Sequence, residues 1–152
     1  MSNFRPGTPA DVPEGSNLDF NETTFDFARG NTGKQLRANA TASASVAITD
    51  TNYNAKSVIA YFTINTFPGS GSTTLALKIQ AVNPDTGGFF TILSGTPRST
   101  TGTTVMMVGP GISASVLGVA AVLPRDLRFL VSQSSGATSK DVTFSIGIHY
   151  TI

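Results

Sequence analysis

Residues 73–93 read TTLALKIQAVNPDTGGFFTIL, and this stretch decides the fold that we predict. From Leu75 to Ala81, apolar side chains alternate with mostly polar ones, and a period of two is typical of a strand with one buried face. Residues 83–88, NPDTGG, place proline, aspartate and glycine where a tight turn needs them. Residues 89–93, FFTIL, then return to strand-forming side chains. The stretch therefore predicts a β-hairpin inside an antiparallel all-β body.

Other segments of the chain show the same alternation between turn-forming residues. Residues 57–65 are partly apolar on both faces, which favours a central position in a sheet. With the hairpin, the chain has seven predicted strands joined mostly by short turns, so we expect an antiparallel two-sheet sandwich with either jelly-roll or immunoglobulin-like topology. The five strands outside the hairpin are predicted at 41–49, 57–65, 103–109, 127–133 and 142–152.

Two segments have a mixed pattern. Residues 34–50, KQLRANATASASVAITD, allow a short helix through Leu36 before the strand at 41–49 begins. Residues 112–123, ISASVLGVAAVL, have apolar positions at a helical spacing, but Gly118 and the valines weaken a helix. We expect this second segment to be a packed crossover between the two sheets.

The chain of 152 residues is long enough for one domain with an appended arm. Residues 1–31 contain several prolines and glycines, which favour extended backbone, so we predict an extended N-terminal arm there and a β-sandwich domain over 32–152. The arm has five acidic and two basic side chains, a net charge of −3, whereas residues 32–152 have eight basic and four acidic, a net charge of +4.

An acidic arm beside a basic body suggests docking onto a neighbouring copy, with aromatic side chains as anchors. The alternative is an ordinary disordered terminus, but phenylalanines this close together are unusual in disordered segments. We hypothesise that the arm becomes ordered only on assembly. The predicted partner-binding residues are Phe4, Arg5, Phe20, Phe25 and Phe27.

Composition limits the chemistry that the chain can perform. Hydrophobic residues make up 39% of the chain and charged residues only 12%, about half the charged fraction of an ordinary domain. There is no cysteine, which excludes disulfides, thiolate metal sites and a cysteine nucleophile. The net charge of +1 gives no general attraction to nucleic acid or to anionic lipid. We expect no membrane span and, because a secretion signal is lacking, no export by that route.

The candidate catalytic and metal-binding groups are few. His149 is the only histidine, and we expect it to face solvent from the polar side of the last strand. The run GNTGK at 30–34 fails as a phosphate loop because Gln35 stands where serine or threonine would hold magnesium. Asp50 and Asp85 are expected to cap turns with their side chains and not to bind calcium. We therefore predict no catalytic residue, cofactor or metal, and a protein that is not an enzyme.

From Leu75 onward, the order of segments resembles a widespread family of small structural proteins encoded by tailed bacteriophages. The resemblance covers about the C-terminal half of the chain and excludes the arm. The segments that carry it are LALKIQ at 75–80, NPDTG at 83–87 with the aromatic residue that follows, IL at 92–93, TGTT at 101–104, GPG at 109–111, LPR at 123–125 before 127–128, and VTFSIG at 142–147.

The resemblance implies a head decoration protein or another minor virion protein: a β-sandwich that binds the outside of an assembled capsid. The implied partners are the major capsid protein and neighbouring copies of the chain, with a trimer favoured, and the implied location is the capsid surface after synthesis in the host cytoplasm. An alternative is a protein of the tail or fibre that contacts host glycans. Neither function involves nucleic acid or a membrane.

Overall fold

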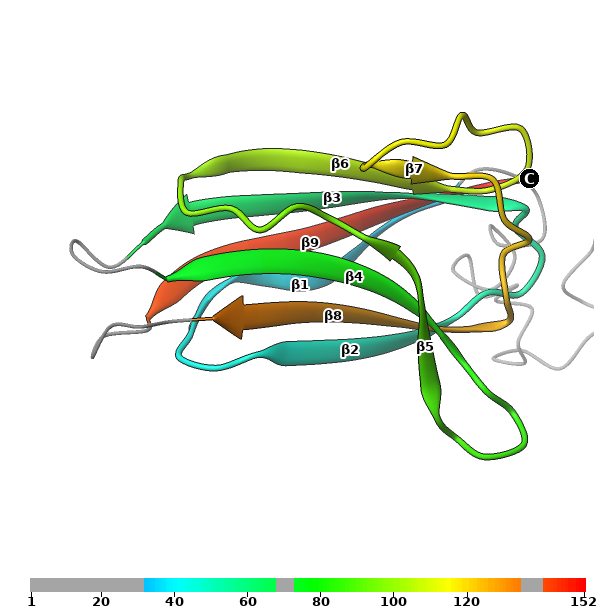
Figure 1. Ribbon diagram of the computed structural model, residues 1–152, viewed down its shortest axis with the longest axis horizontal. Coiled ribbons are helices and arrows are strands. Elements are labelled where there is room, and N and C mark those ends of the chain that lie inside the picture. The colour runs from blue at the N-terminus through cyan, green and yellow to red at the C-terminus, as the bar shows by residue number, and fades with distance from the viewer. Residues whose placement is uncertain (1–31, 68–72, 135–140) are drawn as a thin grey trace, which may run out of the picture.

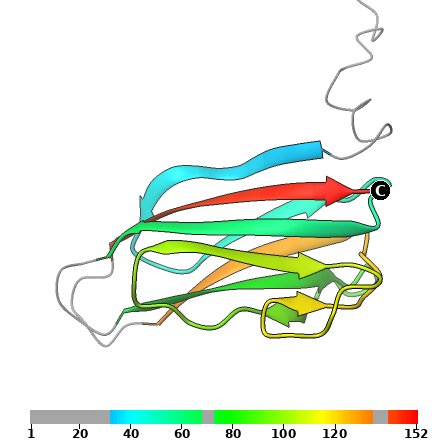
Figure 2. The same ribbon diagram turned by 90° about the horizontal axis from the view of Figure 1, so that it is seen from above.

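The computed structural model describes residues 32–67, 73–134 and 141–152. Within these ranges the chain forms nine strands and no helix, and the strands make two sheets that face each other (Figure 1, Figure 2). The predicted all-β antiparallel sandwich is confirmed, and the predicted arm, 1–31, lies outside the described residues. The strands are β1 (Thr32–Ala42), β2 (Val46–Thr51), β3 (Ser57–Thr66), β4 (Thr74–Val82), β5 (Phe89–Ser94), β6 (Gly102–Val108), β7 (Gly118–Val119), β8 (Asp126–Ser134) and β9 (Val142–Thr151).

The strand order selects one of the two expected topologies. Sheet A has the order β1-β9-β3-β6-β7, and sheet B has the order β2-β8-β4-β5. When the two-residue β7 is set aside, every connection except the β4–β5 hairpin crosses from one sheet to the other. This is the strand order of a jelly roll. An immunoglobulin-like sandwich would instead place the first two strands side by side in one sheet.

The hairpin predicted from residues 73–93 is confirmed as the antiparallel pair β4 and β5. The Asn83 amide donates to the Gly88 carbonyl at 2.7 Å, and the Gly87 amide donates to the Asn83 carbonyl at 2.8 Å. Gly87 has a φ of 69°, in the left-handed region that glycine adopts without a steric penalty. The Asn83 side chain also accepts a bond from the Asp85 amide at 2.9 Å. Each of these contacts is local, so the sequence of the turn is sufficient to specify it.

The inward side chains of both sheets share one apolar core. On β9 every second residue from Val142 to Tyr150 is buried, as the alternation predicts. The rings of Phe62 on β3 and Phe144 on β9 meet edge to face with their centroids 5.6 Å apart, a favoured geometry for aromatic pairs. Sheet B contributes buried side chains of Leu75, Leu77, Ile79, Leu127 and Phe129 to the same core.

The prediction for residues 34–50 is wrong in its details. We expected a short helix and one strand at 41–49, but β1 and β2 are two strands on either side of a bend at 43–45. β1 pairs with β9 and β2 pairs with β8, so the chain passes from sheet A to sheet B at the bend. The Ser45 hydroxyl accepts a bond from the Gln133 amide at 2.9 Å there. Hydrogen bonds to β9, which lies about 100 residues away along the chain, determine the conformation of β1 and outweigh its weak helical preference.

Arg37 stabilises an irregular part of β1. The pairing of β1 with β9 shifts register on both sides of Arg37. The Arg37 guanidinium donates to the carbonyls of Ala40 at 3.1 Å and Thr41 at 3.3 Å. It also lies 4.5 Å from the centroid of the Phe144 ring, a cation–π contact. Bulges and charged side chains of this kind are common on edge strands, where they hinder pairing with other chains.

The expected crossover between the sheets is confirmed, because residues 109–125 lead from β6 in sheet A to β8 in sheet B. The expectation that it is packed is wrong, because most of its side chains, Val116 and Val122 among them, are exposed. No helix forms there. Instead, β7 pairs in parallel with the end of β6. A Cβ atom on Gly118 would lie 3.0 Å from the Ile112 side chain and 3.1 Å from the Ser113 carbonyl, so a larger residue would require this part of the crossover to shift. The described strands number nine instead of the predicted seven because β1 and β7 were not expected as separate strands.

Replacing Phe144 with alanine tests the central role of β9 in the core. We expect Phe144→Ala to lower the free energy of unfolding by about 3–5 kcal/mol, because it leaves a cavity beside Phe62 and removes the ring under Arg37. Urea denaturation measures this loss. Val122→Ala is the control, since Val122 is 85% exposed and its loss should stay within about 0.5 kcal/mol. A loss below about 1 kcal/mol for Phe144→Ala would contradict this account of the core.

Candidate functional site

Asp50 is the centre of a polar cluster that joins the two sheets. Its Oδ1 atom lies 2.5 Å from the Lys34 Nζ atom, and its Oδ2 atom accepts a hydrogen bond from the Tyr150 hydroxyl at 2.9 Å. Asp50 comes from β2 in sheet B, whereas Lys34 and Tyr150 come from β1 and β9 in sheet A. Both carboxylate oxygens therefore have partners within the protein. The cluster is therefore a contact between the two sheets.

The phenol of Tyr150 is strongly perturbed in this cluster. Burial, the negative charge of Asp50 and the hydrogen bond to it all raise the pKa of Tyr150 far above its ordinary value of 10.0. Each cause favours the neutral phenol, which donates its proton to the carboxylate. Tyr150 therefore stays protonated in the folded protein at a pH where an exposed tyrosine ionises.

The expected turn-capping roles of the two aspartates are wrong. Asp50 lies within β2 and binds Lys34 and Tyr150. In the β4–β5 turn, the capping side chain is that of Asn83, and Asp85 contributes its backbone amide. The sequence does not show whether Asn83 or Asp85 caps the turn with its side chain, because asparagine and aspartate favour the same turn positions.

His149 lies on the outer side of β9, where its Cα atom is paired with those of Gly33 on β1 and Ile59 on β3. A Cβ atom on Gly33 would lie 3.6 Å from its imidazole, so the ring rests over that glycine. Among the described residues there is no group of three or more histidine, cysteine, aspartate or glutamate side chains that could hold a metal ion.

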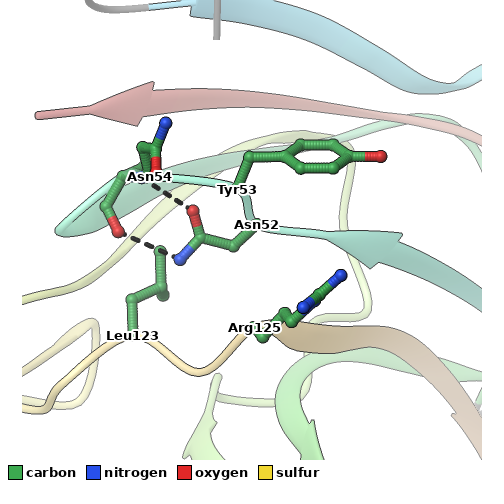
Figure 3. A pocket seen from close by; sticks show the side chains of 6 residues that line it. Asn52, Tyr53, Asn54, Leu123 and Arg125 are labelled. Atoms are coloured by element: carbon green, nitrogen blue, oxygen red, sulfur yellow. Dashed lines mark hydrogen bonds between the residues drawn. The ribbon is translucent and has the colours of Figure 1, made fainter. Parts of the chain in front are cut away.

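An open pocket of about 370 Å³ lies at the end of the sandwich between the β2–β3 connection and the segment before β8 (Figure 3). In this view Tyr53 and Arg125 lie on one side of Asn52 and Leu123 on the other. The Asn52 amide donates to the carbonyls of Ala55 at 3.0 Å and Pro124 at 3.3 Å, and its oxygen accepts from the Ala55 amide. Asn52 therefore holds two loops together, and its polar atoms are engaged in doing so.

The β4–β5 hairpin carries two exposed aromatic side chains, and its turn projects from the body of the sandwich (Figure 1). Phe89 is 48% exposed and Phe90 is 59% exposed. They are adjacent on a strand, so they lie on opposite faces of the hairpin. The guanidinium of Arg128 lies 4.0 Å from the centroid of the Phe89 ring. We call Phe89, Phe90 and Arg128 the hairpin aromatic site.

Arg128 is held in position by a second layer of contacts. Its Nη1 atom donates to the Gln80 Oε1 atom at 3.4 Å, and the Gln80 Nε2 atom donates to the Thr91 hydroxyl at 3.1 Å. Gln80 is buried, so this chain of contacts is fixed against the outer side of sheet B. A cation and a ring held in this way form a rigid surface feature that combines apolar area with positive charge.

A second candidate surface is the outer face of sheet A. The side chains that point into the core from β3, β6 and β9 alternate with those that point outward. On this face Tyr61, Val105 and Met107 are 40%, 37% and 38% exposed. The face is formed by Gly33 and Gln35 on β1, Gly147 and His149 on β9, Ile59 and Tyr61 on β3, and Val105 and Met107 on β6.

Neither surface was identified from the sequence. The predicted partner-binding residues, Phe4, Arg5, Phe20, Phe25 and Phe27, lie outside the described residues. Phe89 and Phe90 were interpreted only as the returning strand of the hairpin, and the residues around them do not show whether another strand covers that hairpin. The apolar second face of residues 57–65 correctly predicted a central strand, because β3 lies between β9 and β6. It did not predict that this face is at the surface.

No protein-family model, curated protein or solved structure matches the chain. Among the described residues, no helix is long and apolar enough to cross a membrane. The structural class is thus defined by the fold and the surfaces alone. The protein is a jelly-roll sandwich with a projecting aromatic hairpin and a partly apolar sheet face.

The Tyr150 pKa predicts a specific dependence of stability on pH. Above about pH 10 the unfolded chain loses the Tyr150 proton and the folded chain keeps it, so the free energy of unfolding falls by up to about 1.4 kcal/mol per pH unit. Tyr150→Phe removes this contribution. At neutral pH we expect Tyr150→Phe to cost about 1–3 kcal/mol, because Asp50 loses a hydrogen-bond donor.

Urea denaturation of the wild type and Tyr150→Phe at neutral pH and above pH 10 measures both effects. The stability gap between the two proteins should narrow as the pH rises. Val122→Ala is the control, because Val122 is exposed and has no ionisable group, and its gap from the wild type should not change with pH. A gap for Tyr150→Phe that is also independent of pH would contradict the assignment.

Proposed function

We propose that the chain is a non-enzymatic structural protein of a bacteriophage virion, a capsid decoration protein that binds the outer surface of the head and stabilises the shell. Its partners are the major capsid protein and neighbouring copies of itself. The resemblance of the C-terminal half to phage structural proteins supports this proposal. Jelly rolls occur in viral capsid proteins and in lectins, so the fold suits a virion protein but does not by itself assign a function.

The observation that carries the proposal is the hairpin aromatic site. Two phenylalanines exposed on a projecting hairpin expose apolar area to water in the isolated chain. A buried aromatic side chain removes about 150–250 Å² from water, and aromatic residues and arginine dominate the energetics of protein interfaces. A neighbouring protein that enclosed the hairpin from both faces would cover Phe89 on one face and Phe90 on the other, and it would keep the contact between Phe89 and Arg128.

The polar groups of the described residues fit a binding protein better than an enzyme. Asp50 is held by Lys34 and Tyr150, and Asn52 is held by two loops. His149 rests over a glycine on an open sheet face. Catalysis needs an acid, base or nucleophile placed within reach of a second functional group and a substrate. The cluster and the pocket lack such a pair of groups directed at a common point.

Attachment to a lattice would use many weak contacts at once. A head surface repeats its binding sites, so a second contact made by the same oligomer gains from a high effective concentration. The arm provides that second contact in this proposal, through Phe4, Arg5, Phe20, Phe25 and Phe27. An oligomer of the chain would join these contacts across neighbouring sites.

A second candidate function uses the same site. Exposed aromatic rings stack on the apolar faces of sugars, so Phe89 and Phe90 would also suit a tail or fibre protein that contacts host glycans. Arg128 beside the ring would then favour an acidic sugar. Binding to heads and binding to cell-surface glycans distinguish the two candidates.

Substitutions in the hairpin test the proposed function. We expect Phe89→Ser and Phe90→Ser each to weaken binding to expanded heads at least about tenfold, because each removes an aromatic anchor. Co-sedimentation with heads that lack the protein measures the affinity. Val122→Ser is the matched control, since it also removes an exposed apolar side chain, and it should bind as the wild type does. Unchanged binding by both phenylalanine variants, or binding to glycans and not to heads, would overturn the proposal.

Removal of residues 1–31 tests the contribution of the arm. We expect the shortened chain to keep its β-sheet circular dichroism spectrum and to bind heads at least about tenfold more weakly, because one of its contacts with the lattice is lost. The same co-sedimentation assay measures this change. Undiminished binding by the folded, shortened chain would refute the role of the arm and leave the role of the hairpin intact.

A further inference from the structure

We infer that the outer face of sheet A is an interface between two copies of this chain, related by a two-fold axis that runs between β3 and β9. In this pairing Tyr61 of each copy packs over Gly147 of the other. The inference goes beyond the proposed function, because it concerns self-association and does not require a capsid. Three features of the face support it: the distribution of bulk, the absence of fixed charge, and the area.

The bulk on the face is unevenly distributed. Tyr61 on β3 is paired on one side with Val105 on β6 and on the other side with Gly147 on β9, which is itself paired with Gln35 on β1. The next row along the strands runs from Met107 through Ile59 and His149 to Gly33, and the His149 ring lies over Gly33. Bulky apolar side chains therefore lie on β3 and β6, and the uncovered glycine, Gly147, lies on β9.

The surface above Gly147 is open. A Cβ atom on Gly147 would find only the Lys34 carbonyl, at 4.0 Å, so the neighbouring Tyr61 ring does not cover it. Paired residues on adjacent strands lie about 4.5–5.5 Å apart. The projecting ring of Tyr61 therefore stands directly beside a hollow one residue wide.

A two-fold axis in the plane of the interface, parallel to β3 and β9 and midway between them, exchanges the two halves. It places β3 of one copy over β9 of the other, and β6 over β1. Tyr61 then meets Gly147, Val105 meets Gln35, and Ile59 meets His149. The Tyr61 ring of each copy is opposite the Gly147 hollow of the other, so the contact occurs twice, as an interface between identical surfaces requires.

The charge distribution favours this face over the outer face of sheet B. A two-fold axis brings residues near it close to their own copies, so a fixed charge there faces a like charge. None of the eight described residues that define the sheet A face is an aspartate, glutamate, lysine or arginine, and the outward residues further along the same strands, Thr41, Thr63, Thr103, Thr143 and Ser145, are also uncharged. The outer side of sheet B carries Lys78 on β4 and Arg128 on β8, which would repel their counterparts.

The area is sufficient for a stable pair. Four strands spaced about 4.8 Å apart, with about ten residues at 3.3 Å each, cover roughly 600 Å² of sheet. Two copies would thus bury about 1,200 Å², at the lower end of the range for specific interfaces. An interface of this size without charged pairs fits a dimer that dissociates at micromolar concentrations.

Sedimentation velocity of the full chain across micromolar concentrations tests the pairing. We expect the wild type to shift from one to two chain masses as concentration rises. Tyr61→Asp should remain at one mass, because two carboxylates would enter the apolar contact. Gly147→Thr should do the same by filling the hollow, and it suits a strand whose outward neighbours Thr143 and Ser145 are also small and polar. Ala47→Asp is the control on the exposed outer side of β2 and should dimerise as the wild type does.

The outcomes separate the possible occupants of the face. A wild type that stays at one mass, or a dimer that both Tyr61→Asp and Gly147→Thr leave intact, overturns the inference. A mass of three chains, which the family resemblance favours, also overturns it, because a two-fold contact closes at two. If the wild type is monomeric and Tyr61→Asp reduces head binding, the face contacts the capsid instead. If the wild type dimerises but does not bind heads, the proposed function is refuted and the inferred dimer is not.

Discussion

The pairing of β9 along both of its edges is the interaction on which the rest of the structure depends. β1 pairs with one edge and β3 with the other, and both pairings run nearly the full length of β9. Since side chains alternate along a strand, this double pairing decides which residues of three strands enter the core. A shift of one residue would turn Phe144 and Ile146 toward solvent. The buried partners on sheet B, among them Phe129, make such a shift costly.

The same register determines the outer surface. Phe62 and Ala60 must face the core, so Tyr61 must face outward beside Gly147. The exposed apolar residues of sheet A thus form a row, because each lies next to a residue of the same strand that must face the core. Their chemistry is nevertheless free to vary, because an outward position accepts polar or charged side chains equally well. Tyr61, Val105 and Met107 together expose more contiguous apolar area than single surface residues do.

Features that depend on neighbours in the sequence could be predicted, and features that depend on distant partners could not. The β4–β5 turn follows from Asn83, Gly87 and the residues between them, and the pattern of β9 is visible in its own alternation. The division between β1 and β2 depends on β9 and β8, which lie far along the chain. The Asp50 cluster likewise needs three strands from two sheets. The candidate surfaces were missed for the same reason, since exposure depends on which strands lie at the edges and how far the facing sheet extends.

The two proposed contacts use opposite sides of the sandwich. The hairpin aromatic site belongs to sheet B, whereas the self-association face is the outer side of sheet A, so one contact does not cover the other. Pairing through sheet A would leave the β4–β5 hairpins of both copies uncovered, because the hairpins belong to sheet B. Such a pair is divalent. It is suited to joining two neighbouring sites on a repeating surface, where linked weak contacts become a strong attachment.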